Sequence, residues 1–485
     1  MRAPSTTEDK EAGGLIVRGA GATAFGFVLR FGARLLFLLA AGRLFGAAGF
    51  GAYAVAVAVV EVAVGVASLG MKKVLFQLLE ERGTRTPGHI LLDCALLVAL
   101  AGAGMGAVVA TAALVLPETL LPANAAHAVL LLAPMVAGQA LLDLLLAATR
   151  WGRAIRYEVI ARSLFEPYAA AAAAIAAWYG GLGAWGLPLG YWCGTLAALA
   201  YALAGTRRSF GPLALANYRP GPLTRIFRSS LDNTAVDVLN ALYTRVDLYL
   251  VGIVLGEAPA GIYGMAKQVA VPIRQVRQSF DGLLIPLVAR TLAVRGSRQT
   301  GDALATATRL ILAIQLPMLL AVLAVGAPVL ALFGHGFEAG WWPLLLLASA
   351  EVIQAAFSIG DLIFVYLKPR LGLAITLASI LIGVAAALLL IPRFGIAGGA
   401  LSVFAAYTLR AIARGVALRT RFDVAVPHSH NAGPFVAAIA GAGAVLALQS
   451  LPWLALAAGL AAYATVLWLW VRVRGESLSL SGFSS

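Results

Sequence analysis

Two apolar segments of this chain carry regular stripes of polar side chains with complementary chemistry. In the segment 229–255, polar side chains recur at steps of four, three, four and three residues, which places them on one face of a helix. They are Asn233, Asp237, Asn240, Thr244 and Asp247, and Arg245 lies beside them. Such a face predicts either a site for a proton or a cation, or a set of partners for basic side chains.

The segment 260–289 carries the basic counterpart. Lys267, Arg274, Arg277 and Asp281 follow one another at steps of seven, three and four residues, again on one helix face. In the segment 15–42, two further arginines lie one turn apart. With Arg274 near the middle of its segment, the acidic and basic stripes suggest a hydrated cavity rather than a dry seam between helices. The predicted substrate-binding residues are Arg30, Arg34, Arg245, Lys267, Arg274 and Arg277.

Carboxylates in apolar surroundings form a second group of candidates. Ionisable groups at membrane depth are costly and usually face the interior of a helix bundle or a wet cavity. The predicted ion-coupling residues are Glu61, Asp237, Asp247 and Glu351, and Asp143 and Asp361 lie in similar surroundings. Each could carry a proton or a sodium ion, or could instead pair with an arginine, as Glu61 could with Arg30. The acidic and basic stripes could likewise neutralise each other, and the sequence leaves these alternatives open.

The elements that must position these residues are transmembrane helices. Of the 485 residues, 61% are hydrophobic and 12% are charged, whereas soluble domains carry about 25% charged residues. A helix that crosses a bilayer needs about 20 mostly apolar residues, and about fourteen segments meet this length. They are 15–42, 49–70, 89–116, 125–148, 160–180, 183–204, 229–255, 260–289, 306–333, 341–366, 371–391, 395–418, 433–450 and 452–471. The sequence therefore predicts an all-α polytopic membrane protein.

Basic residues fall in every second loop between these segments, which predicts their orientation. One set of loops contains Lys72, Arg150, Arg207, Arg290, Lys368, Arg419 and Arg472, and the alternate loops contain little beyond Arg43 and Arg393. By the positive-inside rule, we expect both termini to lie on the cytoplasmic side of a bacterial inner membrane. The formal net charge of +14 then reflects orientation, so nucleic acid is not an expected partner. The polar tail 1–14 lacks the apolar core and cleavage site of a signal peptide, so we expect it to be retained.

An internal repeat predicts two lobes. Residues 45–53 align without gaps with residues 255–263, at a constant offset of 210. Six predicted helices separate the two copies, so the lobes share one orientation, as in alternating-access transporters with a site between parallel repeats. The expected organisation is a cytoplasmic tail 1–14, an N-lobe 15–204, a cytoplasmic linker 205–228, a C-lobe 229–418, a cytoplasmic loop 419–432, two additional helices 433–471 and a cytoplasmic tail 472–485.

The sequence contains none of the motifs that indicate an enzyme. It has no phosphate-binding P-loop, no metal-ligand cluster and no nucleophile motif with a nearby base. Cys94 and Cys193 lie in apolar runs and are too few for a disulfide framework. We therefore expect no enzymatic activity, no cofactor and no metal. Without an ATPase domain, any active transport would use a gradient or the membrane potential.

Four short motifs occur in the order and at the spacing in which a known family of proteins has them. They are Leu44-Phe45-Gly46 with Phe50-Gly51-Ala52-Tyr53, then Thr244-Arg245-Val246-Asp247 leading to Leu255-Gly256 and Gly261-Ile262-Tyr263, then Leu332-Phe333-Gly334, and finally Ile391-Pro392-Arg393-Phe394-Gly395. With them the chain resembles the oligosaccharide flippases of the multidrug/oligosaccharidyl-lipid/polysaccharide (MOP) exporter superfamily, in the polysaccharide transport (Wzx-like) branch.

The resemblance implies two six-helix lobes around a central cavity. It implies that a polyprenyl-diphosphate-linked oligosaccharide is flipped across the cytoplasmic membrane for cell-surface or exopolysaccharide biosynthesis. The implied partners are the lipid-linked oligosaccharide, the lipid bilayer, and polysaccharide polymerase or export proteins. The segment 371–391 contains no carboxylate, which argues against a sodium site of the kind built in lipid II flippases.

Three other functions fit parts of the sequence. A drug or small-solute antiporter of the same superfamily would carry cationic substrates, which an arginine-rich lining would repel. A membrane glycosyltransferase, ligase or polymerase acting on lipid-linked sugars usually needs a sizeable outer loop, and every predicted outer loop is short. A scaffold or channel would not need the two-lobe repeat.

Overall fold

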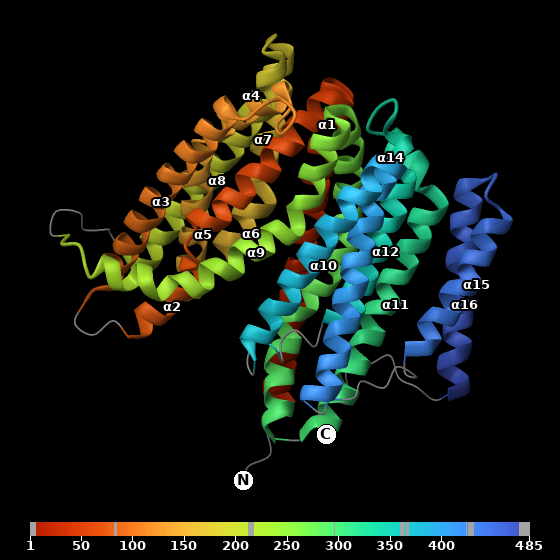
Figure 1. Cartoon of the computed structure of the whole chain (residues 1–485). Helices are drawn as coiled ribbons and strands as arrows, with labels where there is room; N and C mark the ends of the chain where they lie inside the picture. The colour runs from red at the N-terminus through yellow and green to blue at the C-terminus, as the bar shows by residue number, and fades with distance from the viewer. Residues whose placement is uncertain are drawn as a thin grey trace. The chain divides into compact units, whose positions relative to one another are not determined.

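The computed structural model shows a chain in which every described element is a helix (Figure 1). It describes the backbone of residues 6–81, 85–211, 218–294, 296–358, 364, 368–422, 424 and 431–474. Of the residues singled out above, the side chains of Arg30 and Asp281 and all of Asp361 lie outside the described part. The chain divides into two compact units, unit 1 (Met1–Ala241) and unit 2 (Leu242–Ser485).

Unit 1 contains the helices before the middle of α9. They are α1 (Thr6–Ala67), α2 (Met71–Glu80), α3 (Pro87–Val115), α4 (Ala123–Leu132), α5 (Met135–Trp151), α6 (Arg156–Ile160), the π-helix η1 (Ala161–Phe165), α7 (Glu166–Tyr179), the short 3₁₀ turn η2 (Gly183–Trp185), α8 (Gly186–Phe210) and the first part of α9 (Leu223–Leu255). The helices α7 and α8 pack closely because small residues face each other; a Cβ atom on Gly194 would lie 2.5 Å from the carbonyl oxygen of Glu166.

Unit 2 continues from α9. Its helices are α10 (Glu257–Val294), α11 (Gly296–Ala331), the 3₁₀ turn η4 (Phe337–Gly340), α12 (Trp341–Ser358), α14 (Pro369–Arg421), α15 (Ala432–Ala447) and α16 (Pro452–Arg474). The division between the units falls inside α9, whereas the predicted lobe boundary lies in the linker 205–228. The lobe limits therefore stay a prediction.

The number of membrane crossings follows from helix length. Among the described residues, eight helical stretches are long and apolar enough to cross a bilayer, and a ninth arises if the bent pair α4 and α5 forms one span. Two of the eight, Phe31–Glu80 and Arg370–Arg421, contain 50 and 52 residues, more than twice the about 20 that one crossing needs. Each is broken by a glycine and supplies two predicted spans. The predicted spans fall on described helices, apart from the end of 341–366, which lies partly outside the described residues, and this confirms the all-α polytopic fold.

The two glycines at the start of the internal repeat explain why these positions match. Gly46 interrupts α1 with a φ of 68°, and Gly256, 210 residues later, separates α9 from α10 with a φ of 89°. A side chain is strained at such positive φ values, whereas glycine adopts them freely. Gly395 breaks α14 in the same way, with a φ of 59°. Each of these motif glycines therefore turns the chain from one helix into the next.

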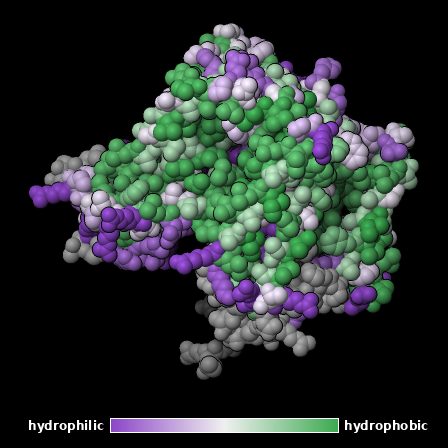
Figure 2. All heavy atoms as spheres, viewed as in Figure 1, coloured by the Kyte–Doolittle hydropathy of each residue, from purple (hydrophilic) through white to green (hydrophobic). Residues whose placement is uncertain are grey.

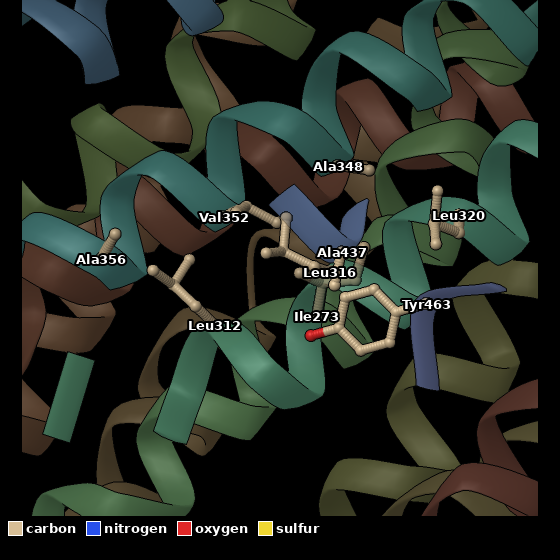
Figure 3. Close-up of a cluster of buried hydrophobic side chains, with 9 residues drawn as sticks. All are labelled: Ile273, Leu312, Leu316, Leu320, Ala348, Val352, Ala356, Ala437 and Tyr463. Atoms are coloured by element: carbon tan, nitrogen blue, oxygen red, sulfur yellow. The ribbon is translucent and has the colours of Figure 1, made fainter. Parts of the chain in front are cut away.

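Each unit has its own apolar core. In unit 2, buried side chains of α10, α11, α12, α15 and α16 meet in one cluster, drawn in Figure 3, which includes Ile273, Leu316, Val352 and Tyr463. The Tyr463 hydroxyl donates a hydrogen bond to the carbonyl oxygen of Ala313, 3.1 Å away, so this buried ring carries no unsatisfied polar group there. In unit 1, Leu142, Leu146 and Ala198 belong to a corresponding cluster.

The outer surface is apolar, as a lipid-facing surface requires. Figure 2 shows hydrophobic side chains over most of the visible face, with hydrophilic side chains gathered toward the ends of helices. Leu114 of α3 and Ile439 of α15 are each 72% exposed. In water such exposure would favour aggregation, whereas in a bilayer it costs nothing.

Candidate functional site

The acidic and basic stripes of unit 2 meet at Asp247 and Lys267. The Lys267 ammonium lies 2.6 Å from each carboxylate oxygen of Asp247 and donates to the carbonyl oxygen of Thr244 at 2.7 Å. The Tyr263 hydroxyl donates to the same carboxylate at 2.6 Å. Asp247 is only 4% exposed. An ammonium has three N–H donors, and these contacts occupy all of them, so the pair joins α9 to α10 as one neutral unit.

Arg274 and Glu351 form a second, looser ion pair between α10 and α12. The nearest nitrogen and oxygen lie 3.6 Å apart, beyond the usual length of a hydrogen bond. The Arg274 side chain is 26% exposed and that of Glu351 is 11% exposed. Glu351 also interacts electrostatically with Lys267 and Arg277. Of the predicted substrate-binding residues, the structure therefore brings Lys267, Arg274 and Arg277 around one carboxylate.

Three buried or stacked arginines extend this group and were not among the predicted site residues. Arg410 of α14 lies over the ring of Tyr243, 4.4 Å from its centre, and Tyr243 stacks on Tyr407 at 4.8 Å. Arg414, one turn further, donates to the Thr376 hydroxyl at 3.2 Å. Arg309 of α11 is also buried. The signal in the sequence was the four-residue spacing of Arg410 and Arg414, the same spacing that drew attention to Arg30 and Arg34.

The predicted spans of unit 2 carry an excess of positive charge. They contain seven basic residues, Arg245, Lys267, Arg274, Arg277, Arg309, Arg410 and Arg414, and four acidic residues, Asp247, Asp281, Glu351 and Asp361. The predicted spans of unit 1 contain four basic residues, Arg18, Arg30, Arg34 and Arg162, and six acidic residues, Glu61, Asp93, Asp143, Glu166, Asp232 and Asp237. The sequence thus leaves three positive charges in the spans of unit 2 and two negative charges in those of unit 1. An anionic ligand is therefore favoured by unit 2.

Two cavities of unit 2 differ in character. A space of about 20 Å³ adjoins Tyr243, Asp247 and Tyr407 and has room for about one water molecule. An apolar groove of about 470 Å³ lies between α11 and α16 and is lined by side chains that include Pro317, Tyr463 and Trp468. Its walls offer contacts to hydrocarbon rather than to polar groups.

The charged side chains of unit 1 form a connected network around a π-helix. Arg162 lies in η1 and pairs with Asp143 and with Glu166, the latter at 2.7 Å. Lys72 lies 2.6 Å from the other oxygen of Asp143. A π-helix is rare and changes the direction of the side chains that follow it, which here brings Arg162 between two carboxylates. This arrangement compensates the charges locally.

The remaining predicted residues of unit 1 lie on α1 and α9. Arg34 and Glu61 are half-buried on α1, and both interact with neighbouring groups. Asp237 lies 4.0 Å from Lys73, at the limit of an ion pair. Arg245 of unit 2 also has interaction partners. That Arg30, Arg34 and Arg245 belong to the same substrate-binding site as Lys267, Arg274 and Arg277 therefore stays a prediction.

The segment that leads into α9 is held by a buried carboxylate that sequence reasoning did not single out. Asp93 of α3 is fully buried and accepts hydrogen bonds from the Tyr218 hydroxyl at 2.8 Å and the Gly221 amide at 2.9 Å, and from Arg85. Arg85 also donates to the carbonyl oxygen of Arg219. Burial, and then the hydrogen bond to Asp93, raise the pKa of Tyr218 to about 12. We call these residues the linker clasp; it fixes where α9 begins on unit 1.

Comparison with known proteins places the chain in a family. The sequence profile of a family described as "Polysaccharide biosynthesis protein" matches residues 39–339, more than half of the chain. The fold is similar to that of "Lipid II flippase MurJ, inward closed conformation", with a TM-score of 0.75 and 11% identity, over 93% of this chain and 100% of that chain. No curated protein matches the sequence significantly.

Two MATE transporters share the fold with lower TM-scores. An inward-facing "multidrug resistance MATE family transporter of the MOP superfamily" gives a TM-score of 0.67 and 12% identity, over 81% of this chain and 94% of that chain. The eukaryotic MATE transporter AtDTX14 gives 0.53 and 18%, over 81% and 92%. At these identities the likeness shows the fold, while the profile shows the family. Together they confirm the resemblance drawn from the four motifs: the chain belongs to the polysaccharide biosynthesis protein family and has the fold of the MOP superfamily.

Proposed function

We propose that this protein flips a polyprenyl-diphosphate-linked oligosaccharide across the bacterial cytoplasmic membrane, for the synthesis of a cell-surface or secreted polysaccharide. The observation that carries the proposal is the excess of three positive charges in the membrane spans of unit 2. A net positive charge at membrane depth is costly, and binding of an anionic ligand would lower that cost. A diphosphate provides two or more.

Within this group, Arg274 and Arg277 are the residues we assign to the diphosphate. Arg274 is partly exposed and its pair with Glu351 is loose, so its N–H groups are accessible to a better acceptor. A guanidinium can bind two phosphate oxygens at once. Lys267 has its donors engaged by Asp247 and Thr244, which favours a structural role for this residue. Arg30, Arg34 and Arg245 remain proposed contributors from the sequence.

The substrate's other parts require different surroundings. The apolar groove between α11 and α16 supports a hydrocarbon chain beside unit 2. The sugar needs hydrogen-bonding groups in a cavity that opens alternately to the two sides, as in other transporters built from parallel repeats. With both termini in the cytoplasm and an inside-negative potential, outward movement of each negative charge gains about 2.3 kcal/mol per 100 mV. Asp237, Asp247, Glu61 and Glu351 are proposed as candidates for any additional ion coupling.

The test is the fate of the lipid-linked substrate in cells that lack the protein. We expect lipid-linked oligosaccharide to accumulate in the inner leaflet, where it is protected from enzymes added outside intact spheroplasts. Complementation with the wild-type gene should restore access, and complementation with Arg274→Ala should not. If the lipid-linked oligosaccharide remains accessible from outside in cells without the protein, the proposed function is wrong.

A further inference from the structure

We propose that Glu351 is an internal competitor for Arg274, which exchanges places with the ligand's phosphate and thereby permits its release. The inference rests on the proposed function, because it concerns the same arginine. It differs from the role predicted from the sequence, in which Glu351 would carry a coupling ion. Under the new assignment Glu351 is a positioning residue that acts through Arg274.

The two ion pairs of unit 2 differ in a way that suits this role. Lys267 and Asp247 are in hydrogen-bond contact at 2.6 Å, whereas the closest approach of Arg274 and Glu351 is 3.6 Å. The first pair is also closed by the Tyr263 hydroxyl. A guanidinium and a carboxylate that lie beyond hydrogen-bond length lose most of the stabilisation that directly hydrogen-bonded partners gain. Glu351 therefore partly compensates the charge of Arg274 but does not hold its guanidinium through a hydrogen bond.

Charged and titratable groups surround Glu351 from every neighbouring helix. The helix α10 supplies Lys267, Arg274 and Arg277, and α9 supplies Asp247. The aromatic stack Tyr243 and Tyr407, from α9 and α14, also interacts electrostatically with Glu351. On its own helix, Gln354 accepts a hydrogen bond from Tyr243 at 3.3 Å. The charged residue of the α11 span is Arg309.

This environment lets Glu351 move off Arg274 without losing all compensation. Lys267 remains its electrostatic neighbour when the diphosphate occupies Arg274 and Arg277. A carboxylate left alone at membrane depth would cost several kcal/mol, but one that keeps a cation nearby meets a smaller penalty. Exchange between carboxylate and phosphate is then close to balanced, and a carrier needs such balance because it must bind its ligand and also let it go.

The experiment compares the wild type with Glu351→Gln, using farnesyl diphosphate as the probe of the diphosphate site. The amide keeps the shape of the side chain and removes the competing charge. We expect it to lower the Kd of the probe about tenfold, which corresponds to the loss of one modest charge contact. In proteoliposomes, kcat and KM should fall together by a similar factor, because the ligand binds more tightly and leaves more slowly. The matched control is Glu338→Gln, a carboxylate of the turn η4 that accepts a hydrogen bond only from the local Gly336 amide among the described contacts.

The outcomes separate this inference from the proposed function. If the wild type and Glu351→Gln both bind farnesyl diphosphate no better than farnesol, both are overturned. Equal affinity of the two proteins for farnesyl diphosphate, with clear preference over farnesol, overturns only the competitor role. Unchanged affinity with transport abolished would return Glu351 to ion coupling. Should the amide variant fail to fold, Glu351→Asp withdraws the carboxylate by one methylene, and tighter binding is again expected; weaker or unchanged binding would refute the inference.

Discussion

The pair of Lys267 and Asp247 gives the sharpest prediction, because it separates a structural from a substrate-binding role. In Lys267→Met, the Asp247 carboxylate stays buried with the Tyr263 hydroxyl as its remaining donor among the described contacts. Removal of one partner of a buried ion pair costs about 3–5 kcal/mol. For a folded unit of the size of unit 2, each kcal/mol of stability corresponds to about 2–4 °C of melting temperature. We therefore expect the melting temperature to fall by about 6–20 °C.

The double variant Lys267→Met with Asp247→Leu should recover part of this loss. An apolar pair of similar volume removes the buried charge, and the residual penalty is the lost acceptor of the buried Tyr263 hydroxyl, about 1–3 kcal/mol. The assay is the apparent melting temperature of the detergent-solubilised protein, followed by tryptophan fluorescence. The control is Lys368→Met, the same substitution at an exposed lysine of unit 2.

The reasoning would be refuted if Lys267→Met melts within about 2 °C of the wild type, since a pair worth at least 3 kcal/mol cannot be removed at that cost. It would also fail if the double variant is as unstable as the single one. In either case Lys267 would be a candidate for direct contact with the substrate, as the sequence first indicated.

Three further predictions follow from the site, the linker clasp and the topology. Arg274→Ala should reduce the transport rate about 10- to 100-fold, because it removes a charge-assisted contact of about 1.5–3 kcal/mol. Arg274→Lys should recover only part of the rate, because the bidentate geometry is lost. Initial rates in proteoliposomes test this, and an alanine variant as fast as the wild type would contradict it. The pKa of Tyr218 rises from 10.0 to about 12 in the folded protein. Its protonated hydroxyl therefore stabilises the fold fully below pH 10, and this stabilisation is lost as the pH rises through 12. The difference in unfolding free energy between the wild type and Tyr218→Phe should shrink over that pH range, and a constant difference would exclude the hydroxyl as its source. Reporter fusions after Arg153, Arg219 and Arg298 should be cytoplasmic and those after Asn124, Ala258 and Ala339 external, and one fusion on the wrong side would overturn the orientation.

Much of the fold could be predicted because lipid imposes a simple rule on sequence. Backbone groups must be satisfied within each span, so apolar length alone locates helices. The breaks were visible as well, since Gly46 and Gly395 stand in motifs between predicted spans and have positive φ. The π-helix at Ala161–Phe165 was not foreseen, although Pro167, two residues further on, has no N–H to donate to the carbonyl oxygen of Ser163 and so opposes an unbroken α-helix there.

The candidate site was predictable only in part. Helical spacing put Arg274 and Arg277 on one face, and it aligned Asp247 with the acidic stripe. Spacing along one helix does not show which residue of a neighbouring helix a side chain contacts. The pairing of Lys267 with Asp247 and of Arg274 with Glu351 is set by how the helices pack. The linker clasp at Asp93 depends on contacts between residues more than a hundred positions apart, which no local pattern contains.

The most direct test of the proposed function is flipping by the purified protein. The protein would be reconstituted into liposomes that contain a fluorescent short-chain polyprenyl-diphosphate oligosaccharide, and the fraction accessible to an impermeant quencher would be followed over time. We expect the accessible fraction to rise from about half, the outer leaflet alone, to nearly all of the lipid with wild-type protein, and to rise far more slowly with Arg274→Ala. A rate that equals that of protein-free liposomes, or one that is the same for a neutral fluorescent lipid, would contradict the account.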